Sequence, residues 1–228
     1  MTLTVFKNTH FLLVTFTILT CFCCKSQSEK KITATEEIET EAIVKEIVLG
    51  ASQVEEYLPL LKNKKIGIVA NQTSVLYLKN ENLDKNSIQK KIEIRLHLVD
   101  YLYNKKINIQ HVFAPEHGFR GKADAGELIK DGVDTKTGLS IISLYGKNKK
   151  PSIQQLEGIE IMIFDIQDVG ARFYTYISTL HYMMEACAEL NIPLLILDRP
   201  NPNGHYIDGP ILEKQHKSFV GMHPVPVI

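Results

Sequence analysis

Glu116 and His117 are the residues in this sequence that most suggest acid–base chemistry, and they follow a predicted strand at 109–114. A carboxyl group on a partly enclosed loop can act as a general acid. Glu127 lies in the glycine-containing loop that follows, and the two glutamates together could form the carboxyl pair that a glycoside hydrolase needs. The alternatives are that Glu116 caps a turn or pairs with Arg120, and that Glu127 is solvated surface.

A second group of polar residues follows the apolar run at 161–164. The carboxylates and the amide of this group could bind sugar hydroxyls or a metal ion, or hydrogen-bond to the start of the next helix. Its arginine could hold a carboxylate in a bidentate pair, and its tyrosines could form a wall for a sugar ring or simply pack in the core. The residues are Asp165, Gln167, Asp168, Arg172, Tyr174 and Tyr176.

Two further polar turns follow apolar runs. Asn71 begins an Asn-Gln-Thr-Ser turn after the run at 65–70, and Asp198, Arg199 and Asn201 follow the run at 193–197. The carboxyl ends of parallel strands meet at one edge of an open sheet, which is where ligands bind. We therefore expect these turns to share a site, although Asp198 and Arg199 could equally pair with each other.

The elements that must position these residues alternate between strand and helix. The run at 161–164, a helix at 175–190 and the run at 193–197 form a strand–helix–strand unit, so the two strands should be parallel. The expected apolar face of the helix consists of Ile177, Leu180, Met184, Cys187 and Ala188. The fold class expected is α/β, with a Rossmann-like, mostly parallel sheet and flanking helices.

The other elements expected along the chain support this class. Helices are predicted at 48–62, 96–103 and 152–156, and strands at 65–70, 109–114 and 139–144. A surface loop is predicted at 77–91, and 121–138 is a long connection of the kind that is often functional at a ligand edge.

Composition and missing motifs exclude several classes of function. The chain has 228 residues with 26 basic and 26 acidic side chains, and this balance argues against nucleic-acid binding, which depends on neutralising phosphates. The sequence contains no glycine-rich nucleotide motif and no GxSxG. Its histidines show no HExxH or HxH spacing. We expect no cofactor and no metal.

The N-terminal region reads as a targeting segment followed by a tether. An apolar run at 11–19 is too short to span a bilayer and leads into Cys21, Cys23 and Cys24, as in a lipoprotein signal; an ordinary secretory signal is the alternative. We assign 1–24 to a lipoprotein signal peptide, 25–48 to a flexible polar tether and 49–228 to the folded domain. Cys187 has no obvious partner and is expected to be a buried helix residue.

Several long motifs resemble, in order, those of the exo-β-N-acetylmuramidase family. They are ANQTS at 70–74, FAPEHGFRG at 113–121, AGE at 125–127, SLYG at 143–146, the segment 164–176, LDRPNP at 197–202 and SFVG at 218–221. The similarity runs from about residue 49 to the end. The segment 76–94 departs from the family pattern, and we interpret it as a surface insertion.

This resemblance implies a Rossmann-like N-terminal domain that carries the active site and a C-terminal domain, which we expect to be missing after Ile228. It implies release of β-1,4-linked N-acetylmuramic acid from the non-reducing end of peptidoglycan fragments such as muropeptides and MurNAc-GlcNAc. Glu116 is the first choice as general acid, and Glu127 is the second carboxylate. Arg120, Arg172 and Arg199 are candidates to bind the lactyl carboxylate of muramic acid.

The remaining residues expected to contact the substrate are Asn71, His117, Asp165, Gln167, Asp168, Tyr174, Tyr176, Asp198 and Asn201. Two other functions stay open. One is a non-catalytic envelope lipoprotein that binds muropeptides or other glycans. The other is a metal-dependent hydrolase that uses Asp165, Asp168 and His117. In each case the protein is expected in the bacterial envelope, in the periplasm and lipid-anchored to a membrane.

Overall fold

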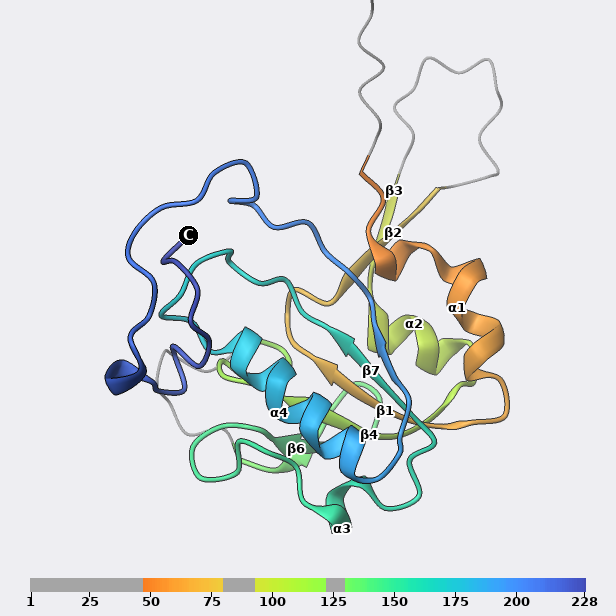
Figure 1. The fold of residues 1–228 in the computed structure, drawn as a ribbon. Coiled ribbons are helices and arrows are strands. Elements are labelled where there is room, and N and C mark those ends of the chain that lie inside the picture. Colours follow the sequence, from red (N-terminus) through yellow and green to blue (C-terminus); the bar gives the residue numbers. More distant parts are fainter. Residues whose placement is uncertain (1–46, 80–92, 122–129) are drawn as a thin grey trace, which may run out of the picture. The chain divides into compact units, whose positions relative to one another are not determined.

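The computed structural model describes residues 47–79, 93–121 and 130–228 (Figure 1). These residues form an α/β unit around a six-stranded sheet with the strand order β5-β6-β4-β1-β7-β8. The strands are β1 (Lys65–Ala70), β4 (Asn108–Ala114), β5 (Gly132–Val133), β6 (Ser140–Ser143), β7 (Ile161–Asp165) and β8 (Leu194–Ile196). The strands predicted from the apolar runs are confirmed to within two residues at each end.

All neighbouring strands of this sheet are parallel except the short β5, which runs antiparallel to β6. From the central β1 the chain proceeds to β4 and β6 on one side, and then crosses to β7 and β8 on the other. The order of the sheet therefore reverses between β1 and β7, and such a switch point is where doubly wound sheets bind ligands. The predicted α/β fold class is confirmed.

Helices cover both faces of the sheet (Figure 1). On one face, α1 (Val54–Leu61) and α2 (Leu98–Asn104) pack with the alternate β1 residues Ile66 and Ile68. On the other face, α3 (Ile153–Leu156) and α4 (Tyr176–Glu189) pack with Val69. The side chains of a strand alternate between its two faces, so each strand of a sheet covered on both faces must be apolar throughout, which explains the continuous apolar runs.

The loop predicted at 77–91 is partly wrong. The strands β2 (Val75–Lys79) and β3 (Glu93–His97) form an antiparallel pair, and residues 80–92 lie outside the described part of the chain. The pairing extends to Val75 with His97, so the helix expected from residue 96 begins only at Leu98. His97 then caps this helix, because its Nδ1 accepts a hydrogen bond from Val99 N at 3.2 Å.

The predicted apolar face of α4 is partly wrong, since Leu180 and Cys187 pack in the core but Ile177, Met184 and Ala188 are exposed. Ile177 and Met184 are 48% and 51% exposed, whereas Ser178 and Thr179 are buried. The prediction placed only apolar residues on the core-facing side of the helix. Thr179 can also face the core, because its hydroxyl donates a hydrogen bond to Thr175 O at 3.1 Å. Cys187 is buried in this helix, as predicted, and burial raises the pKa of its thiol to about 11.

The C-terminal segment after β8 has one short 3-10 helix, η2 (Lys214–His216), and a second such helix, η1 (Gly50–Ser52), precedes α1. Backbone hydrogen bonds hold the segment together, including Asp208 N to Ile228 O at 3.3 Å and Ile228 N to Asp208 O at 3.0 Å. Others attach it to the loop before α4, such as Arg172 N to Val227 O at 2.7 Å. No helix within the described residues is long and apolar enough to cross a membrane.

Candidate functional site

The carboxyl ends of the five parallel strands bring together the polar turns that the sequence singled out. Asn71 follows β1, Glu116 follows β4, Asp168 follows β7 and Arg199 follows β8, and Tyr145, which was not among the predicted site residues, follows β6. The expectation that these turns share one edge of the sheet is met by the strand order. The edge includes the switch point between β1 and β7, where the turns containing Asn71 and Asp168 face each other.

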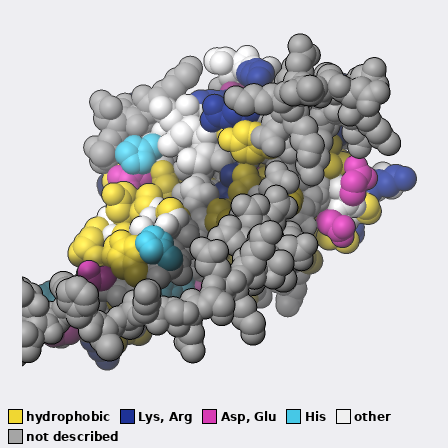
Figure 2. Space-filling model, turned by 90° about the horizontal axis from the view of Figure 1, so that it is seen from above, with side chains coloured by type: hydrophobic (Ala, Val, Ile, Leu, Met, Phe, Trp, Pro, Cys, Tyr) yellow, Lys and Arg dark blue, Asp and Glu magenta, His cyan; other side chains and the backbone are white. Residues whose placement is uncertain are grey.

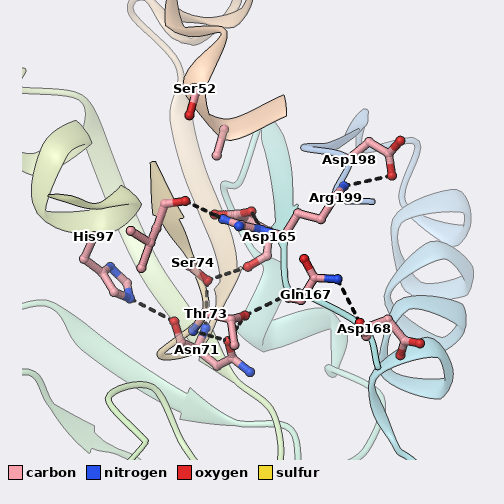
Figure 3. Close-up of polar contacts among 12 residues, drawn as sticks. Ser52, Asn71, Thr73, Ser74, His97, Asp165, Gln167, Asp168, Asp198 and Arg199 are labelled. Carbon is pink, nitrogen blue, oxygen red and sulfur yellow. Dashed lines mark hydrogen bonds and ion pairs between the residues drawn. The ribbon is translucent and has the colours of Figure 1, made fainter. Parts of the chain in front are cut away.

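Hydrogen bonds connect the turns after β1 and β7 into one rigid unit (Figure 3). The Asn71 side-chain oxygen accepts from Thr73 N at 2.8 Å and from Thr73 Oγ1 at 2.6 Å, as in an Asx turn. Thr73 Oγ1 in turn accepts from Gln167 N at 3.0 Å, and Ser74 Oγ donates to the carbonyl oxygen of Asp165. The side chain of Gln167 donates to Pro200 O at 2.8 Å, so it acts as a strut between the turns after β7 and β8.

Glu116 is held by two hydroxyl groups. Thr175 Oγ1 donates to Glu116 Oε2 at 2.9 Å, and the hydroxyl of Tyr145 also hydrogen-bonds to this carboxylate. Burial, then the hydrogen bond to Glu116 and its charge, raise the pKa of Tyr145, so this hydroxyl stays a donor at neutral pH. The chain turns sharply after Glu116, since His117 has a φ of 67° and Gly118 a φ of 73°.

Tyr176, the first residue of α4, places its hydroxyl between the turns. Burial and the charges of Glu116 and Asp168 raise the pKa of Tyr176, while hydrogen bonds from Asn71 and Gln72 oppose this rise. Its ring is buried in the core. The amide nitrogen of Asn71 approaches this hydroxyl closely enough to affect its pKa, but it is buried and forms no hydrogen bond of good geometry within the described residues. Tyr174, by contrast, is 50% exposed.

The guanidinium group of Arg199 forms an internal ion pair with Asp165 (Figure 3). Nε lies 2.7 Å from Asp165 Oδ1, one terminal nitrogen lies 3.1 Å from Asp165 Oδ2, and the same nitrogen donates to Val75 O at 2.9 Å. The two side chains are 5% and 0% exposed. Burial raises the pKa of Asp165, and Arg199 opposes that rise. Asp198, the partner that the sequence suggested, instead accepts a hydrogen bond from the backbone nitrogen of Arg199 at 2.9 Å.

The other two candidate arginines also bind protein groups. Arg120 donates to both oxygens of Asp100 and of Asp134, at 2.7–3.3 Å. Arg172 donates to Val225 O at 2.9 Å and to Pro210 O at 2.8 Å, which fastens the C-terminal segment. All three guanidinium groups thus have bonding partners inside the protein. The contact of these arginines with a lactyl carboxylate stays a prediction. To make it, an arginine must bind the lactyl carboxylate in addition to, or in place of, its protein partner.

Two adjoining cavities lie along this edge of the sheet. One, of about 200 Å³, is lined by residues that include Gln167, Asp168, Tyr176 and Arg199. The other, of about 180 Å³, lies between Asp168 and the C-terminal residues 220–228. Asp168, Ile177 and Asn201 line both, so the two form one hollow over the turn after β7. Neither Glu116 nor its partner Thr175 lines them, but Tyr176, the residue after Thr175, lines the first.

Sequence reasoning missed Tyr145 and Thr175, the two residues that orient Glu116. Their positions carried a signal, because Tyr145 follows a strand and Thr175 precedes a helix. Glu127, the predicted second carboxylate, lies outside the described residues, so its placement is not tested. No cluster of three or more potential metal ligands occurs among the residues that the structure describes. The guanidinium on Asp165 also disfavours a metal at that carboxylate.

Comparison with known proteins decides the family. Residues 66–228 match the family described as the N-terminal part of the exo-β-N-acetylmuramidase NamZ. The chain belongs to this family. The NamZ_N match contains Asn71, Glu116, Asp168 and Arg199, so every turn described above lies within the family domain.

Individual relatives agree with this assignment. Over 174 residues the chain is 46% identical to the peptidoglycan β-N-acetylmuramidase NamZ of Bacillus subtilis. The aligned region covers 75% of this chain and 38% of the Bacillus protein. Two solved structures of DUF1343 family proteins from Bacteroides fragilis have TM-scores of 0.62, with 43% and 34% identity. They cover 80% and 79% of this chain, and the matched parts amount to 43% and 42% of those proteins. The chain therefore spans less than half the length of these NamZ and DUF1343 relatives.

Proposed function

We propose that this chain carries the catalytic site of an exo-acting glycoside hydrolase that releases β-1,4-linked N-acetylmuramic acid from the non-reducing end of peptidoglycan fragments. The observation that carries the proposal is the setting of Glu116. This carboxyl group stands at the ligand-binding edge of the sheet, close to the switch point, and two hydroxyl groups orient it. The family and the name of the Bacillus relative supply the class of reaction.

In the proposed mechanism Glu116 is the general acid. As the bond between C1 of the muramic acid residue and the leaving oxygen breaks, its electron pair stays on that oxygen, which takes the proton of Glu116. Water supplies the hydroxyl group that ends on C1, and a second carboxylate assists it. Thr175 fixes Oε2 and with it the plane of the carboxyl group, so the proton is delivered in one direction.

The experiment that tests this proposal changes Glu116 to Gln and compares two substrates. General acid catalysis contributes about 10²–10⁴-fold, so natural muropeptides should lose that factor in turnover. An aryl β-N-acetylmuramide with a good leaving group needs less protonation and should lose much less. Glu157→Gln is the matched control, because Glu157 is an exposed glutamate at the end of α3, away from the site. It should leave both rates unchanged.

Each contrary result has a definite meaning. Equal losses on the two substrates would remove Glu116 from the acid role, and wild-type rates on both would remove it from catalysis altogether. If the wild-type protein binds muropeptides and releases no sugar from either substrate, the alternative of a glycan-binding lipoprotein replaces the proposal.

We further propose that the protein is held in the bacterial envelope by a lipid on Cys24, with Cys21 as the rival position. The support is the sequence pattern alone, in which an apolar run leads into cysteines and a polar tether; these residues lie outside the described part of the chain. Cys24→Ala should release the protein into the soluble periplasmic fraction. Membrane fractionation that persists in this variant and disappears in Cys21→Ala would move the lipid to Cys21.

A further inference from the structure

We propose that Asp168 is the second carboxylate of the glycosidase pair and acts at C1 on the face opposite the leaving group. This inference rests on the proposed function. It assigns Asp168 a role at the reacting atoms, where the sequence suggested Glu127 and gave Asp168 only a binding role.

The two oxygens of the Asp168 carboxylate differ in their surroundings. Oδ2 accepts a hydrogen bond from Gly170 N at 2.8 Å, which fixes the side chain. Oδ1 is buried and accepts no hydrogen bond within the residues that the structure describes. A buried carboxylate oxygen without a donor is costly, and such atoms in folded proteins call for an explanation. An oxygen that receives a proton from water, or bonds to C1 itself, needs this free lone pair.

The turn that presents Asp168 is rigid. Gly170 has a φ of 72°, which favours glycine, and a Cβ atom there would lie 2.0 Å from Asn201 Oδ1, so any other residue would strain the turn. Asn203 Nδ2 donates to Val169 O at 3.0 Å and so ties the turn to the segment after β8. Catalytic groups need this kind of support, because small displacements reduce the rate strongly.

Asp168 also lies in the right place relative to Glu116. Asp168 and Tyr176 line the same cavity of about 200 Å³, and Thr175, the neighbour of Tyr176, holds Glu116 at 2.9 Å. The charges of both carboxylates act on the Tyr176 hydroxyl. Glu116 follows β4 and Asp168 follows β7, so the two carboxyl groups stand at the same edge of the sheet on either side of the turn after β1.

The other aspartates described at this edge are less suitable. Asp165 is fully buried and bound to Arg199 through both oxygens, so its lone pairs are already used. Asp198 is exposed and caps its own neighbouring backbone nitrogen. Asp168 combines a fixed orientation, an unused oxygen and access to a cavity.

Figure 2 shows that hydrophobic side chains and histidines gather on the side of the molecule that carries the C-terminal segment, and residues of this segment line the second cavity beside Asp168.

The proposed step is balanced without a cofactor. Water gives one proton to Asp168 Oδ1 while its oxygen bonds to C1, and the bond from C1 to the leaving oxygen breaks as Glu116 protonates that oxygen. If Asp168 bonds to C1 directly, water later cleaves this ester and its proton returns to Glu116. In both versions one water is consumed, and both use the same lone pair on Oδ1.

The test is chemical rescue with azide in the full-length protein. Wild-type turnover of an aryl β-N-acetylmuramide is measured first, and its absence would defeat the proposed function rather than this inference. Asp168→Ala and Asp168→Asn should then lose about 10²–10⁴-fold in turnover. Azide should restore turnover in Asp168→Ala and yield an α-configured glycosyl azide, because azide replaces the carboxylate opposite the β-linked leaving group.

Asp208→Asn is the matched control, since Asp208 also accepts a hydrogen bond from a glycine nitrogen, that of Gly209, but is exposed and lines neither cavity. It should keep wild-type turnover. A β-configured azide product would place Asp168 on the leaving-group side and overturn the inference. So would turnover within about threefold of wild type in both Asp168 variants, or a loss in Asp168→Ala that azide does not relieve while circular dichroism shows a native fold.

Discussion

The buried ion pair between Arg199 and Asp165 allows the sharpest test of how the site is built. Arg199→Met removes the guanidinium group and leaves the Asp165 carboxylate, which is 0% exposed, without its partner. Three hydrogen bonds are lost together, two to the carboxylate and one to Val75 O. Removing one member of a buried ion pair costs about 3–5 kcal/mol, because the remaining charge stays in a medium of low polarity.

The assay is equilibrium unfolding in urea at neutral pH, followed by circular dichroism. Asp165→Asn should destabilise the protein to a similar degree. The double variant should be less unstable than the sum of the two single variants predicts, because it leaves no unpaired charge. Lys150→Met breaks an exposed pair with Glu189 and should have a much smaller effect. If Arg199→Met costs less than about 1 kcal/mol, the value of an exposed pair, the internal role of Arg199 is wrong.

Three further outcomes follow from the same contacts. Burial favours a raised pKa for Asp134, but hydrogen bonds from Arg120 and Thr137 lower this pKa from 3.8 to about 2. The charged Asp134 side chain therefore stabilises the folded state above pH 4, and this contribution is lost as the pH falls towards 2. Asp134→Asn should cost about 2 kcal/mol of unfolding free energy at pH 7 and almost nothing at pH 2. Thr175→Val removes a donor to Glu116 and should lower kcat about tenfold with little change in KM or in Tm. Gly170→Ala should cost about 1–3 kcal/mol in urea unfolding, because of its positive φ and the crowded site; an unchanged midpoint would show that the turn can relax.

Much of the fold could be predicted because each element has a local signal. The strands β1 and β7 are covered on both faces, so their sequences are mostly apolar, and the polar residues that follow mark where each strand ends. The parallel order followed from the strand–helix–strand pattern. The position of Glu116 at the ligand edge could be expected from the same rule.

The errors concern features that depend on distant parts of the chain. The core-facing side of α4 was partly misjudged because Ser178 and Thr179 face the core, which an apolar count does not anticipate. The antiparallel pair of β2 and β3 was missed because the polar, Asn- and Lys-rich sequence from 77 to 91 indicated a loop, and the pairing joins segments that are far apart in the sequence.

The partners of the arginines could not be predicted either. Asp100 lies on α2 and Asp134 in a loop, and only the folded chain brings both to Arg120. For the same reason, sequence reasoning suggested Asp198 for Arg199 where the structure has Asp165. Adjacent charges are visible in a sequence, whereas pairs between strand ends are not.

The central claim is that the site cleaves a muramic acid glycoside. The most direct measurement is the release of chromophore by the full-length protein from an aryl β-N-acetylmuramide beside the matching aryl β-N-acetylglucosaminide, which lacks the lactyl group. The account predicts turnover of the muramide that far exceeds turnover of the glucosaminide. Equal turnover of both substrates, or no turnover of the muramide, would contradict it.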